Sequence, residues 1–268
     1  MNFCGKVLRI LKKFVKAVTP YGIVILFRRM KAKKTLIAAG DTHKNYCPIC
    51  RKTSYFEQAG FPPRSRALCP HCRSVERHRL LWLFLRQNTR IFSETTAKIL
   101  HVAAEPFLEK RLRKLYGKNY ITADLYNPNA MVQMDIMDIR YPDETFDVII
   151  CNHVLEHVAD DIKAMNELHR VLKKTGWAVL LVPIGDREKT YEDSRITSEG
   201  GRFWAFGQKD HLRKYGKDYT DRLRSAGFTV SVIGRNALAD TKKIQEMGLK
   251  EDSETWGFIG TEIFFCVK

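Results

Sequence analysis

Two short cysteine motifs constrain this chain more than any other feature. Cys47 and Cys50 flank a Pro-Ile pair, Cys69 and Cys72 flank a Pro-His pair, and eighteen residues separate the two motifs. Two intervening residues let both sulfurs of a pair face one ion, and the proline presets the turn. The spacing predicts a small zinc ribbon with four thiolates around a structural zinc ion and no position left for substrate. The alternative is that the cysteine pairs are oxidised to disulfides. We expect a reducing compartment, which disfavours disulfides.

The positive charge of the chain is concentrated in its first third. The formal net charge is +16, and residues 1–95 hold 20 Lys/Arg against 4 Asp/Glu, whereas residues 96–268 hold 26 of each. A basic segment of this size indicates an anionic partner, which can be nucleic acid, a membrane surface or an acidic glycan. A solvated basic face without a partner is the alternative.

The N-terminus has the pattern of a basic amphipathic helix. Residues 6–18 place apolar side chains on one helical face and lysines and an arginine on the other. The uncharged run that follows, residues 17–27, has eleven residues and is too short to span a bilayer, and no cleavage site of small residues follows it. We therefore expect a cytoplasmic chain with a peripheral membrane contact. A helix packed on the protein's own core or on another subunit is the alternative.

From residue 98 onward the sequence alternates between strand and helix patterns. Strands are predicted over residues 98–103, 120–124, 146–151, 177–183, 228–233 and 262–267, and helices over 106–115, 160–172 and 217–226. Two of the strands are nearly continuous apolar runs, which is typical of strands buried on both faces. This alternation predicts an α/β fold with a doubly wound parallel sheet and a ligand at the carboxyl ends of its strands.

The most specific pattern covers residues 135–157. An acidic residue, Asp135, precedes the segment Tyr-Pro-Asp-Glu-Thr-Phe-Asp (141–147). A buried strand follows, and Val-Leu-Glu-His-Val (154–158) comes after that strand. Further along, Arg-Val-Leu-Lys-Lys-Thr-Gly (170–176) precedes another strand. In these features residues 96–268 resemble the class I S-adenosylmethionine-dependent methyltransferases. The resemblance implies a Rossmann-like, seven-stranded sheet. The expected organisation is a basic N-terminal segment (1–45), a zinc ribbon with a linking helix (46–95) and a methyltransferase domain (96–268).

The resemblance also implies residues that bind the cofactor. Asp124, at the end of the second strand, matches the acid that accepts hydrogen bonds from both ribose hydroxyls. Asp135, with the backbone of Ile136, matches the contact to the adenine amino group. Asn152 and His153 follow the third strand and are expected to face the transferred methyl group or the substrate. A surface turn is the alternative role of Asp124, and a helix cap is that of Asp135.

The first loop departs from the family pattern. Members of the family have an acid followed by glycines, as in Asp-x-Gly-x-Gly, whereas this chain has His101-Val-Ala103-Ala-Glu105-Pro. Because glycine lets a backbone approach a ligand most closely, its absence changes how the loop holds a cofactor. We expect Ala103 and Glu105 to lie against the methionine part of S-adenosylmethionine, and we interpret the departure as the mark of a subfamily.

Residues 184–216 form a polar segment between a strand and a helix. Loops of this length in a compact domain are usually lids or binding loops. His211 is the candidate general base, because its ordinary pKa lies near neutrality, and the next candidates are His153 and Tyr215. The substrate-binding candidates are Glu192, Asp193, Trp204 and Arg213. A helix cap formed by Asp210 and His211 is the alternative.

A second metal set can be assembled from His153, Glu156, His157 and His211. The two histidines at 153 and 157 are four residues apart, as on one face of a helix. The Leu-Glu-His segment is nevertheless widespread in methyltransferases that use no metal, and the sequence alone therefore disfavours this set.

These observations predict an S-adenosylmethionine-dependent methyltransferase with a structural zinc. The aromatic and polar lid, together with the N-terminal helix, favours O-methylation of a saccharide, a lipid-linked glycan or another polar small molecule. The main alternative is a methyltransferase of ribosomal or transfer RNA that uses the basic zinc ribbon to hold phosphates. A catalytically inactive binding module is the third hypothesis, and the glycine-free first loop is its support.

Overall fold

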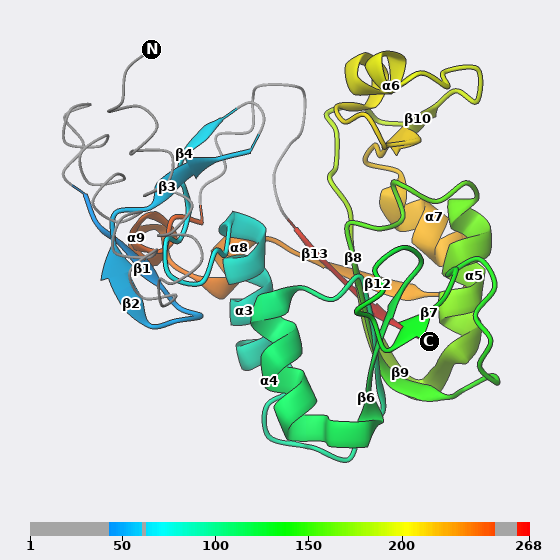
Figure 1. The fold of residues 1–268 in the computed structure, drawn as a ribbon, viewed down its shortest axis with the longest axis horizontal. Coiled ribbons are helices and arrows are strands. Elements are labelled where there is room, and N and C mark those ends of the chain that lie inside the picture. Colours follow the sequence, from blue (N-terminus) through cyan, green and yellow to red (C-terminus); the bar gives the residue numbers. More distant parts are fainter. Residues whose placement is uncertain (1–42, 61–62, 250–261) are drawn as a thin grey trace, which may run out of the picture.

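A computed structural model of the chain describes residues 43–60, 63–249 and 262–268, and the helix predicted over residues 6–18 lies outside them. A seven-stranded sheet forms the centre of the described molecule (Figure 1). Its strand order is β12-β13-β9-β8-β5-β6-β7. The strands are β5 (Ile99–Val102), β6 (Tyr120–Asp124), β7 (Val132–Gln133), β8 (Phe146–Asn152), β9 (Leu172–Leu181), β12 (Thr229–Ile233) and β13 (Ile263–Val267).

The pairing of these strands confirms the predicted Rossmann-like fold. Strands β7, β6, β5, β8 and β9 pair in parallel, and β13 pairs antiparallel with both β9 and β12. From β5 the chain builds the sheet outward through β6 and β7, and it then returns to build the other half from β8. The strand order therefore reverses between β5 and β8, and ligands of such sheets bind at this switch point, outside the carboxyl ends of the strands.

Four main helices flank the sheet: α3 (Glu76–Asn88), α4 (Pro106–Tyr116), α5 (Asp161–Val171) and α7 (Tyr219–Ser225). Helix α4 begins with a proline, whose fixed φ suits the first helical position, and the Asp160 side chain caps α5 by accepting a hydrogen bond from the Lys163 amide. Shorter helices are η1 (Gly117–Asn119), α8 (Arg235–Leu238) and α9 (Thr241–Glu246). No helix of the described part of the chain is long and apolar enough to cross a membrane.

The two cysteine motifs lie in a small β module that precedes α3. Residues 43–75 with their described strands β1 (Asn45–Cys47), β2 (Lys52–Ser54), β3 (Glu57–Ala59) and β4 (Arg64–Leu68) are here named the cysteine module. Helix α3 follows it and joins the core of the sheet, because Leu81, Phe84 and Leu85 belong to the same buried cluster as the strands. The domain limits expected near residues 45 and 95 stay a prediction.

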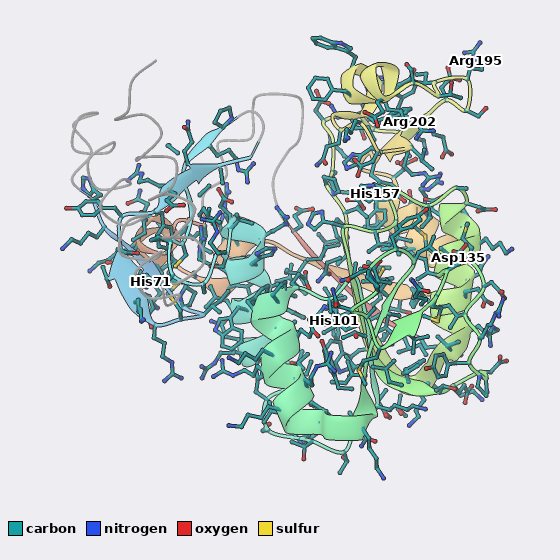
Figure 2. All side chains as sticks on the ribbon, viewed as in Figure 1. His71, His101, Asp135, His157, Arg195 and Arg202 are labelled. Atoms are coloured by element: carbon teal, nitrogen blue, oxygen red, sulfur yellow. The ribbon has the colours of Figure 1, made fainter. Side chains whose placement is uncertain are left out.

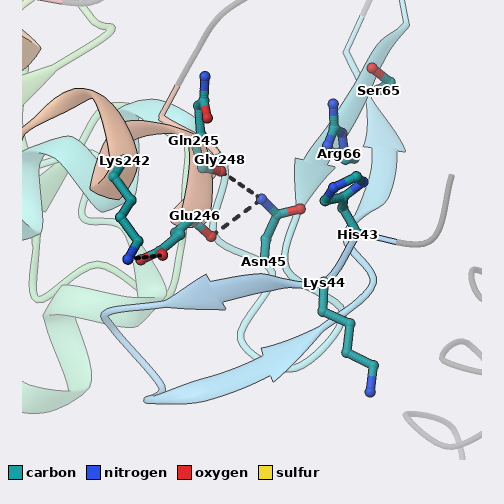
Figure 3. A pocket seen from close by; sticks show the side chains of 9 residues that line it. All are labelled: His43, Lys44, Asn45, Ser65, Arg66, Lys242, Gln245, Glu246 and Gly248. Carbon is teal, nitrogen blue, oxygen red and sulfur yellow. Dashed lines mark hydrogen bonds and ion pairs between the residues drawn. The ribbon is translucent and has the colours of Figure 1, made fainter.

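A buried arginine fastens the cysteine module to the rest of the fold. Arg79 of α3 is fully buried, and its guanidinium donates to the carbonyls of Ala67, Ser74 and Gly248. The Asn45 amide also donates to the Gln245 carbonyl, 2.9 Å away. Figure 3 shows the pocket between the module and α9, where basic side chains of both parts line the walls. This pocket lies apart from the switch point of the sheet.

The segment between β9 and α7 is more ordered than the sequence suggested. Residues 184–216, here named the lid segment, contain β10 (Tyr191–Glu192), α6 (Glu199–Phe206) and β11 (Arg213–Lys214). Its two ends lie side by side, since the Gly185 amide donates to the Tyr215 carbonyl at 2.6 Å. Figure 1 shows α6 and β10 at one end of the molecule. A strand pair and a helix thus satisfy much of its backbone, and the role of a lid or binding segment stays a prediction.

Candidate active site and cysteine cluster

The predicted cofactor residues lie at the carboxyl edge of the sheet. Asp124 is the last residue of β6, Asp135 follows β7 by two residues, and Asn152 is the last residue of β8. Parallel strands bring their carboxyl ends to one edge, so these positions share the edge at which β5 and β8 form the switch point. The predicted strands had placed Asp124 and Asn152 there, whereas the position of Asp135 followed from the family resemblance.

A chain of four polar side chains crosses the switch point. The Glu105 carboxylate, in the loop after β5, lies 2.7 Å from Nε2 of His101 and accepts a hydrogen bond from the Asn152 amide at 3.0 Å. Nδ1 of His101 lies 2.7 Å from the Tyr120 hydroxyl of β6. Nε2 of His101 thus faces the Glu105 carboxylate and Nδ1 faces the Tyr120 hydroxyl, so both ring nitrogens have a hydrogen-bond partner. Strands β5, β6 and β8 are thus joined at the site through side chains.

Glu105 carries a carboxylate in the place of a family glycine. Burial by itself would raise the pKa of this carboxyl, but the hydrogen bond and charge of His101 and the amide of Asn152 lower it to about 2. The group is therefore anionic at neutral pH. A fixed negative charge at the switch point suits the ammonium group of an amino-acid moiety.

Ala103 explains how the first loop keeps its shape without glycine. Its φ is +47°, in the left-handed region that glycine normally occupies, and its amide donates to the Ala123 carbonyl at 2.8 Å. A non-glycine residue in this region costs on the order of 1 kcal/mol, which the surrounding strands must offset. The loop therefore forms a left-handed turn with alanine at this position in the absence of glycine.

Asp124 and Asp135 both form local turns with one carboxylate oxygen. Oδ1 of Asp124 accepts hydrogen bonds from the amides of Tyr126 and Asn127, and Oδ1 of Asp135 accepts from that of Met137. These contacts fix the direction of each carboxylate and leave Oδ2 available to a ligand. Ile136 is buried beside Asp135. The turn role and the ligand role are therefore compatible, and the contacts to ribose and adenine stay a prediction.

The residues just after β8 hold polar atoms without partners. His153 has a φ of +55°, and its Nδ1 lies 3.3 Å from Oε1 of Glu156. Within the described residues, Oδ1 of Asn152, Nε2 of His153 and Oε2 of Glu156 are buried and have no hydrogen-bond partner. Buried polar atoms are rarely left unpaired, so this cluster is prepared for a ligand.

His211, the candidate base, is brought to this cluster by the lid segment. It is 2% exposed, and burial lowers the pKa of its imidazole. Its Nδ1 lies 3.3 Å from the Phe206 carbonyl, and its ring meets that of His157 edge-on at 4.8 Å between centroids. The alternative of a helix cap is wrong, because β11 rather than a helix follows His211.

Arg213 and Tyr215 have structural contacts that the sequence did not reveal. Arg213 is 3% exposed, and its guanidinium donates to the carbonyls of Leu155, Val158 and Ala159. The Tyr215 hydroxyl is buried 2.8 Å from Oδ2 of Asp161, and burial raises the pKa of the phenol well above its usual range. A fully buried phenol with a raised pKa is a poor base. These contacts correct the expected substrate role of Arg213 and catalytic role of Tyr215.

The other substrate candidates lie on the outer part of the lid segment. Glu192 accepts from Nε of Arg213 at 3.0 Å, and Asp193 forms an exposed ion pair with Arg195. Trp204 of α6 is 76% exposed, with Phe203 beside it. The substrate roles of Glu192, Asp193 and Trp204 therefore stay predictions. Of these three side chains, Trp204 is the one that presents an exposed aromatic ring to solvent.

The four motif cysteines converge on one point, as predicted. Sγ of Cys47 lies 3.5 Å from that of Cys72, Sγ of Cys50 lies 3.7 Å from that of Cys69, and all four lie within 4.8 Å of one another. None of them is disulfide-bonded. Zn–S bonds of about 2.3 Å in a tetrahedron place sulfurs about 3.8 Å apart. The cluster has the size that such a metal requires.

The backbone and charges of the cluster also suit a cation. The residues after each motif, Arg51 and Arg73, have φ of +57° and +63°, and their amides donate to the carbonyls of Cys47 and Cys69, so the two motifs form matching turns. Contact with the neighbouring thiols lowers the pKa of Cys47 and raises that of Cys69. Four thiolates at these separations would repel one another, and a bound cation would offset that repulsion.

The sequence missed His101 and Tyr120 as parts of the site. The spacing of His101 and Glu105, four residues apart across a strand end, was visible, but spacing alone does not show that the two side chains face each other. Tyr120 opens a strand that was predicted correctly, and its partner is known only from the sheet register. The departure of the loop from the family pattern was the one available signal.

The comparisons with known proteins agree with this arrangement. Residues 87–180 match the family model described as "Methyltransferase domain". Two uncharacterized proteins of Methanocaldococcus jannaschii are similar in sequence: one is 37% identical over 65 residues and the other 28% identical over 126 residues. These alignments cover 23% and 46% of this chain, and the chain spans 28% and 57% of the length of those relatives.

Similar solved structures include an S-adenosylmethionine-dependent methyltransferase from Mesorhizobium loti, with 14% identity, a TM-score of 0.48, and coverage of 70% of this chain and 98% of that one. Another is a 1,6-didemethyltoxoflavin-N1-methyltransferase from Burkholderia thailandensis, with 13% identity, a TM-score of 0.45, and coverage of 72% and 77%. These scores are low, so the assignment depends on the family match and the strand order. Residues 87–180 therefore match a methyltransferase domain, and they lie within a Rossmann-like sheet.

Proposed function

We propose that the chain is an enzyme that transfers a methyl group from S-adenosylmethionine to an oxygen of a polar small molecule or glycan. The supporting observation is the carboxyl edge of the sheet. Asp124, Asp135 and the Glu105–Asn152 contact lie there, within the residues that match a methyltransferase domain. S-adenosylmethionine would supply a methyl group on a cationic sulfur. The carbon–sulfur bond would break as the bond to the acceptor oxygen forms, leaving neutral S-adenosylhomocysteine, and the proton of the acceptor hydroxyl would pass to a base or to water. The protein contributes chiefly by aligning the two partners.

Three contacts would hold the cofactor in this proposal. Asp124 accepts hydrogen bonds from the ribose, Asp135 and the Ile136 backbone contact the adenine, and Glu105 receives the ammonium group of the methionine part beside the Ala103 turn. The last contact follows from charge: the carboxylate is ionised, and its two described donors leave acceptor capacity on both oxygens.

Glu105→Gln should weaken the binding of S-adenosylmethionine by about 10- to 100-fold, because the ammonium loses a charge-assisted partner. Isothermal titration calorimetry on the purified protein measures this directly. Glu109→Gln is the matched control: Glu109 lies one turn along α4, pairs with the exposed Arg113, and should leave affinity unchanged. Equal affinities for wild type and Glu105→Gln would place the ammonium elsewhere.

Asp124→Ala should cost about 1.5–3 kcal/mol of cofactor binding, the range for losing hydrogen bonds to a charged acceptor. S-adenosylhomocysteine serves as the ligand, since it keeps the ribose and is not consumed. Asp138→Ala provides the control, as this carboxylate lies on the surface with Arg140 as its partner. An unchanged dissociation constant for Asp124→Ala would exclude the ribose contact. No measurable binding to the wild-type protein would instead favour the inactive module.

The acceptor class is supported by the lid segment. An exposed Trp204 next to Phe203 offers an aromatic face, on which sugar rings commonly pack, and it belongs to a segment that leaves the carboxyl edge after β9. Incubation of a cell extract with isotopically labelled S-adenosylmethionine and the enzyme tests this. Label recovered in a saccharide or lipid-linked glycan supports the proposal, and label recovered in RNA overturns the acceptor class.

RNA is the second candidate because of the basic pocket in Figure 3. His43 and Lys44 of the cysteine module, Arg66 of β4 and Lys242 of α9 line it, with Glu246 as the acidic member. Basic side chains on a zinc-ribbon-like module suit phosphates. RNA binding would weaken steeply as salt rises, since counterions are released on binding. Absence of such binding at low salt would leave small molecules and glycans.

We also propose that the cysteine cluster holds one structural zinc ion. Cys47, Cys50, Cys69 and Cys72 would complete a four-thiolate tetrahedron, and such a closed set leaves no position for substrate. The expected cytoplasmic location and the peripheral membrane contact of residues 6–18 stay predictions, because that segment lies outside the described residues.

A further inference from the structure

Glu156 is a buried acid with a free oxygen. Its side chain is 2% exposed, Oε1 lies 3.3 Å from Nδ1 of His153, and Oε2 is buried with no hydrogen-bond partner within the described part of the chain. A carboxylate oxygen enclosed in this way carries a large desolvation cost unless a donor or a cation meets it. The surroundings of Oε2 therefore point to a ligand that the protein chain itself does not supply.

Two imidazoles reach the same point from different segments. His157 lies one residue after Glu156, and His211 comes from the lid segment, 54 residues further along the chain. Ligand-type atoms of Glu156, His157 and His211 all lie within 4.8 Å of one another. Figure 2 shows His157 where the lid segment meets the body of the fold. The amide of Leu212 donates to the Glu156 carbonyl at 2.8 Å, so a backbone hydrogen bond holds the lid segment against the residues that follow β8.

Each of the three side chains is oriented by a second contact. Nδ1 of His211 lies 3.3 Å from the Phe206 carbonyl, and Nδ1 of His157 lies 3.2 Å from the Asp210 carbonyl. A carbonyl only accepts hydrogen bonds, so in the tautomer that fits both contacts Nδ1 donates and Nε2 is the nitrogen that can bind a metal. Histidines that bind metals are usually oriented in this manner, with the second nitrogen donating to a carbonyl or carboxylate.

We propose that Glu156, His157 and His211 form a binding site for a divalent transition-metal ion, distinct from the cysteine cluster. Two imidazoles and one carboxylate are ligands that zinc and iron(II) accept, and three protein ligands leave positions open. Provided that the proposed function holds, the open positions would take an oxygen of the acceptor, since His153 and Asn152 connect this site to Glu105 at the switch point. His211 is then a metal ligand rather than the general base.

Metal analysis of the purified protein tests the site without any turnover. After saturation with Co²⁺ and removal of excess ion, the wild type should retain two ions per chain. The thiolate site gives intense sulfur-to-cobalt absorption in the near ultraviolet, and the second ion should add visible bands without increasing it. His211→Ala and His157→Ala should each reduce the affinity for the second ion by about 100-fold or more, as even the loss of an orienting contact costs 10- to 100-fold.

The choice of variants separates binding from folding. His157 is about one-third exposed, so its alanine variant should fold even if that of the buried His211 does not. His169→Ala, on α5 beside Phe228, is the matched control and should retain both ions. One ion per wild-type chain, or two ions in His157→Ala, would overturn the proposal. Calorimetry with S-adenosylhomocysteine on the same samples reports on the proposed function independently.

Discussion

Cys69→Ser should abolish the binding of one zinc ion per chain and unfold the cysteine module. The module has little core of its own: its buried cluster contains Phe56 and the cysteines themselves, with Ile49 at its edge. Metal binding must therefore supply most of its folding free energy, which for zinc-finger peptides reaches about 10–16 kcal/mol. Metal analysis gives the stoichiometry, and hydrogen exchange should show lost protection across β1 to β4.

The same variant should leave the sheet folded. Leu81, Phe84 and Leu85 tie α3 to the core of the sheet, so protection there should persist. Cys4→Ser replaces a cysteine outside the two motifs and serves as the control, with zinc content expected to match that of the wild type. Zinc retained by Cys69→Ser, or iron found in the wild type in its place, would contradict the proposed metal. Unchanged exchange in the module would show that packing alone folds it.

Asp161→Ala should lower the free energy of unfolding by about 3–5 kcal/mol, the usual cost of removing one partner of a buried ion pair. Asp161 is 3% exposed and contacts Arg222 at 2.5 Å, while the Tyr215 hydroxyl lies 2.8 Å away. Without it, Arg213 and Arg222 remain close together with Glu192 as their partner. Denaturant unfolding followed by circular dichroism measures the change.

An exposed ion pair on α7, the helix that carries Arg222, provides the control. Asp221 and Arg224 of α7 are both more than half exposed, so Asp221→Ala should change stability by no more than about 1 kcal/mol. A similar loss of stability in Asp161→Ala and Asp221→Ala would show that the buried network contributes no more than an exposed ion pair. The lid segment should also become more accessible to protease in Asp161→Ala, because Arg213 and Tyr215 hold its final strand.

The pH dependence of this network follows from the direction of the shift. Burial would raise the pKa of Asp161, but Arg222, Arg213 and Tyr215 lower it below its usual value. The folded state therefore binds this proton more weakly than the unfolded chain does. Its stabilising contribution is complete above the unfolded pKa of about 3.9 and is lost as the pH falls through the lower folded value. The wild type and Asp161→Ala should converge in stability over that acidic range.

The strands were predictable because their signal is local. Residues 120–124 were expected as a strand and match β6, and the apolar run over residues 146–151 became β8 with one further residue. A strand buried on both faces must be apolar throughout, whatever its neighbours are. By contrast, residues 184–216 gave no clear period, because β10 and β11 have only two residues each. Thr190 and Tyr215, which lie beside these strands, are held by contacts with Asp218 and Asp161.

The active-site predictions show the same difference between positions set by local sequence and positions set by tertiary contacts. Positions fixed by a strand end, such as Asp124 and Asn152, lie where the order of elements put them, because parallel strands share one edge. Roles assigned from residue type alone did less well: Arg213 and Tyr215 have the chemistry of a binding site but are buried in a structural network. Charge and aromaticity describe what a side chain can do and not where it points.

The sequence by itself determined the cysteine cluster, the order of strands and helices, and the edge at which a cofactor would bind, because each depends on spacing or periodicity within one short segment. The tertiary structure decided which side chains meet across segments. It set Glu105 against His101 and Asn152, gave Ala103 the left-handed conformation of a glycine, and carried His211 to Glu156 and His157. Such contacts arise when distant parts of the chain are packed into one core, and short-range patterns do not encode that packing.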